Sequence, residues 1–234
     1  MKKVLLTFLI AIVALACSSK KQGNMIVKGQ IRGLKKGTLY LQKMKDTAII
    51  SVDSVSLLGK DTFTLTDDVT SPVMYYLTFT GNKDNKKLLF FGEPGEITIN
   101  DNIEEFGFAP KISGSKNQEV MDKFAKVDKR FIDQRLDFVK KDLEAKQAKD
   151  EALIAQLELD YKKMVRRRVL FATNFAIANA DTEASPYIAL TQLYDANIKL
   201  LDTINSSLSD KVKKSDYGLR LQKFVDEIKS KEKQ

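Results

Sequence analysis

The periodicity of apolar residues changes near Ser115, and this change constrains the fold more than any other feature of the sequence. Before it, short runs alternate apolar and polar residues and are separated by turn residues, which predicts an antiparallel β domain over 25–114. After it, apolar residues recur every three or four positions, which predicts a helical domain over 115–229. The sequence therefore predicts an α+β protein whose last residues, 230–234, form a disordered tail.

The β domain is predicted to contain about eight short strands. An open sheet of that width would leave one apolar face in water, so the strands predict a β-sandwich or a partly closed barrel. The predicted strands are Met25–Arg32, Thr38–Lys43, Ala48–Leu57, Thr62–Thr66, Val73–Thr80, Lys87–Phe91, Glu96–Asn100 and Phe108–Ser113.

The first predicted helix carries two apolar rows, the second displaced from the first by one position. The first row is Val120, Phe124, Val127 and Phe131, and the second is Ile132, Leu136, Val139 and Leu143. Asp150 is the predicted N-cap of a second helix, and Ser185 that of a third, because Pro186 suits the first helical position. Shorter helices are predicted over Asn197–Ser206 and Ser215–Lys229.

The N-terminal stretch predicts the compartment of the protein. Lys2 and Lys3 precede an apolar run from Val4 to Leu15, which is the layout of a secretory signal peptide over residues 1–16. The run is shorter than the about 20 residues that a transmembrane helix needs. We therefore expect an exported protein.

The sequence Ala14-Leu15-Ala16-Cys17 at the end of this stretch resembles the lipobox of bacterial lipoproteins. The resemblance implies that Cys17 is diacylated, and two acyl chains give stable membrane anchoring. No aspartate follows Cys17, which by resemblance to known sorting rules favours an outer-membrane lipoprotein facing the periplasm. Ordinary cleavage after Ala16 is the competing interpretation, because Ala14 stands where the lipobox usually has leucine.

The absence of some residue types narrows the possible chemistry. The chain has no histidine, which is the commonest general base and metal ligand, and Cys17 is its only cysteine. The formal net charge of +8 becomes +6 without Lys2 and Lys3, and an exported chain meets anionic lipid and acidic glycans rather than nucleic acid. We therefore expect no enzyme, no cofactor, no metal site and no nucleic-acid partner.

Short motifs in both domains support a family resemblance. In the β domain they are Ile26–Ile31, Gly37–Leu41, Phe91–Ile97 and Ile112–Asn117, and in the helical domain Ser185–Leu190 and Lys214–Leu221. Together they resemble the domain of unknown function 4369 family, which occurs in envelope lipoproteins of Bacteroides-type bacteria. In that family a helical segment and then a thioredoxin-like disulfide reductase domain commonly follow the β domain.

The resemblance implies a reductase site of the form Trp-Cys-x-x-Cys beyond the last helix. The sequence has no tryptophan and no second cysteine, so reductase activity is assigned to no residue. The leading hypothesis is a binding or accessory module for an envelope partner, such as a thioredoxin-like reductase. The alternative is a lipoprotein whose β domain binds a glycan or a small apolar molecule. Aromatic residues of that domain would either line such a site or fill the core: Tyr75, Tyr76, Phe79, Phe90 and Phe91.

Other local patterns are weaker. Ser113 and Lys116 have the spacing of serine acyl enzymes, but the partner motifs are missing, and the same spacing occurs at Ser18 and Ser230. Arg166–Arg168 forms a basic cluster that we expect on a solvated helix face. Acidic residues predicted in exposed turns lack the spacing of a calcium loop: Asp67, Asp68, Asp101, Glu104 and Glu105.

Three Asp-Ser/Thr-apolar triplets resemble the sites that Bacteroides-type bacteria O-glycosylate on exported proteins. The resemblance implies modification at Thr47, Ser54 and Thr203. The intact mass of the native protein tests this prediction.

Overall fold

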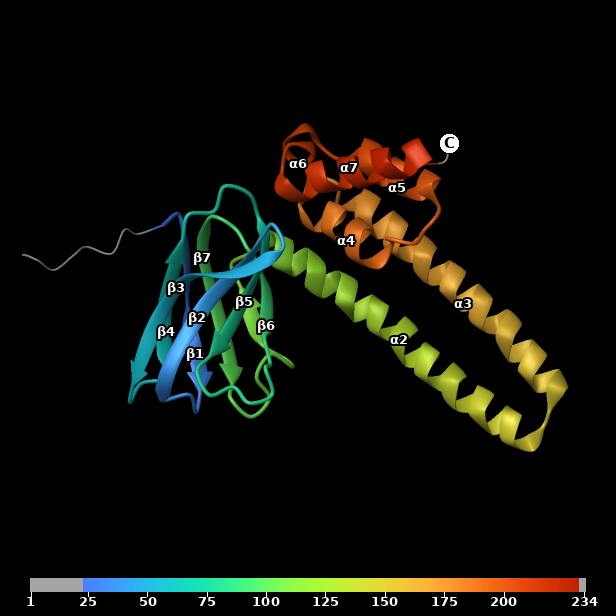
Figure 1. Cartoon of the computed structure of the whole chain (residues 1–234), viewed down its shortest axis with the longest axis horizontal. Helices are drawn as coiled ribbons and strands as arrows, with labels where there is room; N and C mark the ends of the chain where they lie inside the picture. The colour runs from blue at the N-terminus through green and yellow to red at the C-terminus, as the bar shows by residue number, and fades with distance from the viewer. Residues whose placement is uncertain (1–22, 232–234) are drawn as a thin grey trace, which may run out of the picture.

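The computed structural model describes residues 23–231 and places eight strands before six helices (Figure 1). The predicted signal peptide and Cys17 lie outside the described residues, as do residues 232–234 of the predicted tail. The strands are β1 (Met25–Arg32), β2 (Lys36–Lys45), β3 (Ala48–Leu58), β4 (Thr62–Asp67), β5 (Val73–Phe79), β6 (Leu88–Gly92), β7 (Gly95–Asn102) and β8 (Lys111–Ser113). The helices are α2 (Lys116–Ala148), α3 (Glu151–Ala178), α4 (Ala184–Gln192), α5 (Ile198–Ser207), α6 (Asp210–Lys213) and α7 (Asp216–Lys231). α7 continues two residues past the predicted end of the helical domain at 229, so the prediction of a disordered tail is wrong for Ser230 and Lys231.

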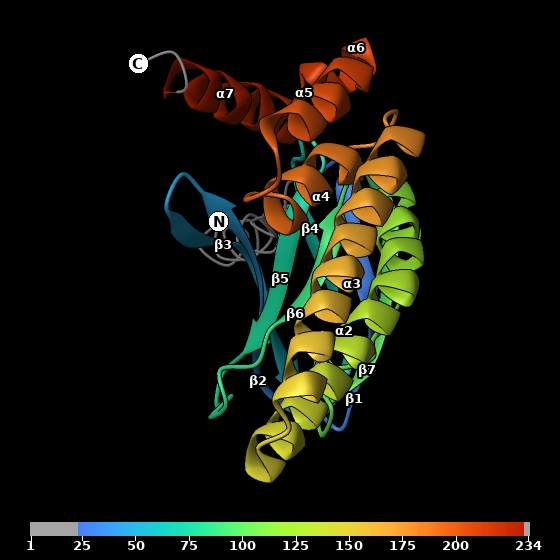
Figure 2. The same cartoon turned by 90° about the vertical axis from the view of Figure 1, so that its right-hand side faces the viewer.

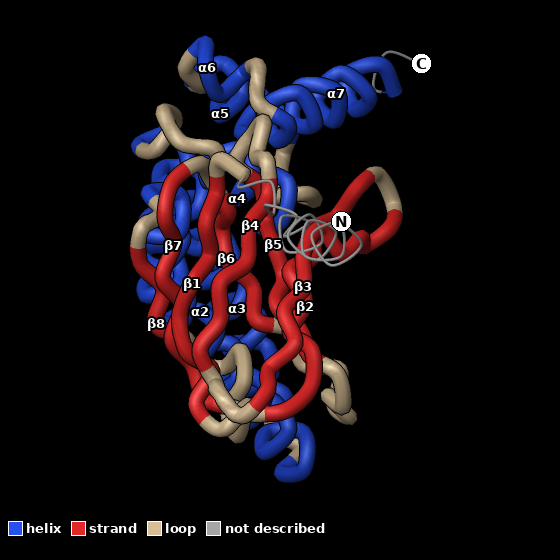
Figure 3. The backbone as a smooth tube through the Cα atoms, turned by 90° about the vertical axis from the view of Figure 1, so that its left-hand side faces the viewer, coloured by secondary structure: helices blue, strands red, loops and turns tan. Residues whose placement is uncertain are grey.

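The strands form two four-stranded sheets, in the orders β4-β1-β7-β8 and β3-β2-β5-β6. The sheets do not close into a barrel, so of the two predicted arrangements the structure has the sandwich. Their strands run along a common direction (Figure 3). β1 and β7 pair in parallel, with Val27 opposite Ile97, so the prediction of a purely antiparallel domain is wrong for this pair.

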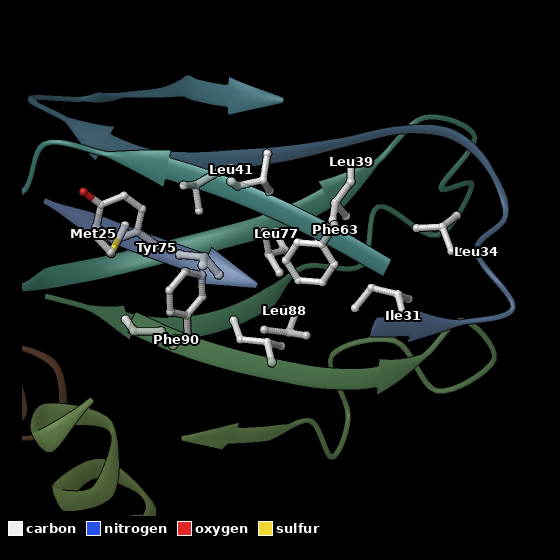
Figure 4. Packing of buried hydrophobic residues seen from close by; sticks show 14 of the residues in the cluster. Met25, Ile31, Leu34, Leu39, Leu41, Phe63, Tyr75, Leu77, Leu88 and Phe90 are labelled. Carbon is white, nitrogen blue, oxygen red and sulfur yellow. The ribbon is translucent and has the colours of Figure 1, made fainter. Parts of the chain in front are cut away.

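The core of the sandwich comes from alternate side chains on the facing sides of the two sheets. Met25, Ile31 and Phe63 come from one sheet, and they pack against buried leucines and aromatic rings of the other (Figure 4). Tyr75 and Phe90 are fully buried within it, with ring centroids 5.8 Å apart. Of the aromatic candidates, Tyr75 and Phe90 therefore fill the core and Phe79 packs against it. Phe91 lies in a separate buried cluster, and Tyr76 is half-buried outside the core, with the Lys87 ammonium over its ring.

α2 and α3 form a long hairpin that projects away from the rest of the molecule (Figure 1). Ser115 caps α2 by accepting a hydrogen bond from the backbone N–H of Gln118 at 3.0 Å. Lys149 turns the chain in a left-handed conformation, and the Asp150 carboxylate caps α3 by accepting from the Leu153 N–H at 3.0 Å. None of the helices within residues 23–231 combines the length and the apolarity that crossing a bilayer requires.

Helices α4, α5, α6 and α7 pack around the half of the hairpin that lies nearest the sheets (Figure 2). The prediction that Ser185 caps a helix is wrong, because α4 already begins at Ala184 and Ser185 is buried inside it. The Ser185 hydroxyl donates instead to the carbonyl of Ala176 at 2.8 Å. The predicted start of the last strand is also wrong, since Phe108 lies in a turn and β8 begins at Lys111.

An aromatic cluster joins the sandwich to the helices. The Phe91 ring of β6 meets Tyr187 of α4 and Tyr217 of α7 edge-on, with centroids 5.6 and 5.9 Å apart. Two hydrogen bonds cross the same junction: the Tyr217 hydroxyl accepts from the Met74 N–H at 3.1 Å, and the Gln118 side chain accepts from the Phe91 N–H at 2.9 Å. The two parts therefore share one packed interface.

Candidate interaction surface

An inner row of aromatic residues on α2 packs against α3. Phe124 stacks on Phe171 with ring centroids 5.4 Å apart, and Phe131 contacts the same ring at 5.8 Å. Nearer the tip of the hairpin, Phe138 meets Tyr161 edge-on at 5.9 Å. We call Phe124, Phe131 and Phe138 the inner row. Their seven-residue spacing keeps them on the side of α2 that faces α3.

A second apolar row on α2 has no such covering. Ile132, Leu136, Val139 and Leu143, which we call the outer row, are 50%, 62%, 51% and 57% exposed. Each step along an α-helix rotates a side chain by about 100°, so a row displaced by one residue from the inner row points away from α3. The sequence predicts the whole outer row and, of the inner row, Phe124 and Phe131, and the structure packs only the inner row against rings of α3.

The hairpin carries most of the exposed apolar surface of the described residues. Sixteen large apolar side chains are exposed among residues 23–231, and nine of them lie on α2 or α3. Single exposed apolar residues are ordinary on protein surfaces, whereas a concentration on one projecting element marks an interaction site. Those on α3 are Leu153, Leu159, Tyr161, Val165 and Leu170.

Charged residues of both signs flank the outer row. Asp133 and Lys140 lie on the side remote from α3, and Arg135 and Asp142 lie on the side nearer to it, as helical geometry places them. Their ion pairs run along α2 itself: Lys129 with Asp133 at 3.1 Å, Lys146 with Asp142 at 2.7 Å and Lys140 with Glu144 at 4.0 Å. Exposed pairs of this kind contribute little stability, so these charges can change partners easily.

Two of the depressions in the described surface of the helical part are lined by exposed apolar residues of the hairpin. One, of about 350 Å³, lies near the tip between α2 and α3, and Val139 of the outer row is among its lining residues. The other, of about 550 Å³, lies between α3 and the start of α5, and we call it the α3–α5 groove. It is apolar apart from two cations and one amide, and no acidic residue lines it. Its lining residues are Arg166, Val169, Leu170, Ala196, Asn197, Lys199 and Leu200.

The basic cluster Arg166–Arg168 is divided between different environments. Arg166 lines the α3–α5 groove and Arg167 is exposed, but Arg168 turns inward, so the prediction of a solvated face is wrong for this residue. The Arg168 guanidinium donates to both carboxylate oxygens of buried Asp128, at 2.7 and 2.9 Å. The hydrogen bond from Arg168 to Asp128 raises the pKa of the guanidinium, so this pair stays charged and ties α2 to α3.

The Ser113–Lys116 spacing does not assemble an acyl-enzyme site. The Lys116 ammonium pairs with Asp181 at 2.7 Å, and this hydrogen bond raises the pKa of Lys116. Activation of a serine needs a neutral amine, and a raised pKa keeps the amine protonated. The match at Ser18 and the lysine at 233 lie outside the described residues.

The acidic residues do not converge on a cation site. The prediction of an exposed turn is wrong for Asp67, which lies on β4 with its side chain largely buried. It accepts hydrogen bonds from the Tyr75 hydroxyl of β5, at 2.6 Å, and from Lys43 of β2. Burial raises the pKa of Tyr75 far above its ordinary value, and the bond to Asp67 adds to the shift. Asp101 accepts from the Gly107 N–H at 2.7 Å. Within residues 23–231, no group of three or more acidic, histidine or cysteine side chains is placed to hold a metal ion.

The predicted glycosylation residues are all exposed, in three different settings. Thr47 lies in the turn between β2 and β3, and Ser54 lies on β3. Thr203 lies within α5, where its hydroxyl donates to the Lys199 carbonyl at 2.7 Å. Their modification remains a prediction, and Cys17 cannot be placed because it lies outside the described residues.

Comparison with protein families identifies the N-terminal part of the chain. Residues 25–121 match the family described as Domain of unknown function (DUF4369), which confirms the resemblance found in the sequence. The match covers all eight strands and the first turns of α2, so the likeness to this family lies in the sandwich. Comparisons with curated proteins and with solved structures gave no match.

Proposed function

We propose that this chain is a non-enzymatic, lipid-anchored lipoprotein of the outer membrane that faces the periplasm. It acts as a binding or accessory module for an envelope protein. The family resemblance suggests a thioredoxin-like reductase as the class of partner. Cys17, at the end of an N-terminal apolar run, supports the anchor.

The observation that carries the proposal is the apolar surface of the α2–α3 hairpin. This element extends away from the packed part of the molecule and exposes nine large apolar side chains. Binding another protein would remove this apolar surface from water, and that transfer is energetically favourable.

The α3–α5 groove is the surface that we assign to the envelope partner. It combines apolar walls with Arg166 and Lys199, and no acidic residue among its lining balances these two charges. It therefore suits an apolar segment flanked by acidic residues, since opposite charges steer association and fix orientation.

The proposal of a non-enzymatic role is supported by the contacts of the side chains that could take part in catalysis. Lys116, Arg168 and Tyr75 each have a carboxylate partner. The matched family is described only as a domain of unknown function, and this description indicates no catalytic activity. The ligand-binding alternative loses its support because Tyr75, Phe90 and Phe91 are buried in packed clusters.

Crosslinking in cells, followed by affinity purification and mass spectrometry, tests this function. The full chain is compared with two variants. Leu170→Glu changes the groove, and Gln156→Glu is a control at an exposed position of α3 about 21 Å nearer the tip of the hairpin. We expect a stoichiometric envelope partner with the native chain and with Gln156→Glu, and its loss with Leu170→Glu. The variant Cys17→Ser should lower its yield. A partner retained by Leu170→Glu would contradict the assignment of the groove, and no partner in any variant would contradict the accessory function.

A further inference from the structure

We propose that the outer row of α2 binds the outer row of a second copy of this chain, with the two α2 helices antiparallel. This inference rests on the proposed function, in which the hairpin is a protein-binding element. It concerns a surface separate from the α3–α5 groove. It therefore makes the module a dimer with one groove on each copy.

The spacing of the outer row suits side-by-side packing of helices. Its members follow one another at intervals of four, three and four residues, which is the pattern by which two helices interlock their apolar side chains. The row is about 16 Å long. Lys129 and Lys146 occupy the next positions of the same pattern, so the row is a bounded patch suited to a reversible contact.

An antiparallel pair matches the row to itself. With the twofold axis between Asp137 and Phe138, Leu136 lies opposite the second copy's Val139, and Ile132 lies opposite the second copy's Leu143. Every apolar residue of the row then meets another, in four layers. A self-complementary patch of this kind is what a twofold dimer requires.

The flanking charges distinguish the antiparallel from the parallel arrangement. In the antiparallel pair, Asp133 lies beside the second copy's Lys140, and Arg135 beside the second copy's Asp142, so all four flanking contacts join opposite charges. In a parallel pair, Arg135 would instead lie beside the second copy's Lys140, which is a like-charge contact. Charges at these flanking positions set the orientation of paired helices, so they favour the antiparallel dimer.

The shape of the molecule leaves room for this pairing. The centre of the outer row lies about 32 Å along the helix from Lys116, where α2 leaves the sandwich, and about 17 Å from Lys149 at the tip. In an antiparallel pair each tip therefore stops about 15 Å short of the other copy's sandwich. α3 lies about 110° around α2 from the outer row, so all four of its side chains stay at least half exposed, and only Val139 also lines the depression beside α3.

Disulfide trapping in cells tests the arrangement on the full chain. Ile132→Cys and Leu143→Cys are expressed separately and then together, with different tags and a brief oxidant treatment. In the antiparallel dimer these two positions face each other, whereas each is about 16 Å along the axis from its own equivalent, too far for a disulfide. The unsubstituted chain controls for disulfides formed by Cys17.

We expect a disulfide-linked mixed dimer upon co-expression that is at least tenfold more abundant than the linked dimer of either single variant. Equal linkage in the single variants would indicate a parallel pair and overturn the proposed orientation. No linkage in any combination, with the variants present at native levels, would overturn the dimer itself.

Charge reversal provides a second test with substitutions that leave the fold intact. Asp133→Lys places two like-charge contacts in the antiparallel dimer, and we expect the dissociation constant to rise at least threefold. Adding Lys140→Asp restores opposite charges and should restore the affinity. Failure of the double variant to recover would contradict the antiparallel register.

The two proposals fail in different ways. Trapped self-dimers without any other crosslinked protein would leave the dimer standing and remove the accessory function. An envelope partner that is lost with Leu170→Glu, in a chain that gives no self-disulfides, would do the reverse.

Discussion

The inner and outer rows of α2 have similar apolar character and similar spacing, but they lie in different environments. Phe131 contacts the ring of Phe171 on α3, whereas its neighbour Ile132 is half exposed. The rings of the inner row pack against aromatic rings of α3, whereas the side chains of the outer row are at least half exposed. The comparison teaches that apolar periodicity identifies a face for burial without saying which molecule will bury it.

The largest effect should come from removing a ring of the inner row. Phe124 is almost fully buried, stacks on Phe171 and meets Phe175 edge-on. Phe124→Ala should lower the free energy of unfolding by about 3–5 kcal/mol, because it removes apolar burial and leaves a cavity. Urea unfolding followed by circular dichroism measures it. A loss below about 1 kcal/mol would mean that the inner row contributes no more than the outer row to the stability of the fold.

A smaller loss should follow when the polar tie beside the inner row is weakened. Asp128→Asn removes the negative charge that two guanidinium nitrogens of Arg168 contact. We expect the free energy of unfolding to fall by about 2 kcal/mol, which is less than for a fully buried ion pair because Arg168 is partly exposed to water. Asp133→Asn, beside the outer row, is the matched control and should unfold like the native chain. Equal losses in both variants would contradict the distinction between the two sides of α2.

In the sandwich, the buried residue Tyr75 should make the free energy of unfolding depend on pH. Since the pKa of Tyr75 is raised by burial, the folded state keeps its proton at pH values where the unfolded chain releases it. The contribution of Tyr75 to stability is therefore constant below about pH 10 and falls above it, by about 1.4 kcal/mol per pH unit. Tyr75→Phe should flatten that decline in urea titrations between pH 9 and 11. An unchanged slope would mean that another group causes it.

The sequence predicted the regular elements well where local signals determine them. Met25–Arg32 was predicted with its observed bounds, and the break between the long helices was placed at Asp150, which caps α3. The predictions were wrong where a distant contact decides. Ser185 bonds to Ala176 nine residues earlier, and alternation along β1 cannot reveal that β7 is its parallel neighbour.

The candidate surface could be only half predicted. The sequence contains both apolar rows of α2, but nothing in their spacing distinguishes the row that packs on α3. That distinction comes from the angle at which the hairpin closes, which depends on Lys149 and Asp150 and on the stacked rings. The α3–α5 groove joins residues about 30 positions apart, so no local pattern predicts it.

The smallest effect on folding should come from the outer row. Leu136 is 62% exposed, so Leu136→Glu should keep the free energy of unfolding within about 0.5 kcal/mol of the native value at a protein concentration where the chain is monomeric. Gln134→Glu, on the same helix outside the row, is the matched control. A loss of 2 kcal/mol or more in Leu136→Glu alone would mean that the row packs within its own chain.

Sedimentation velocity over a concentration series, on the native full chain, Leu136→Glu and Gln134→Glu, tests the central claim most directly. We predict a concentration-dependent dimer for the native chain and for Gln134→Glu, and a monomer for Leu136→Glu at the same concentrations. A native chain that stays monomeric throughout, or a Leu136→Glu variant that dimerises like it, would contradict the claim that the outer row is an interface.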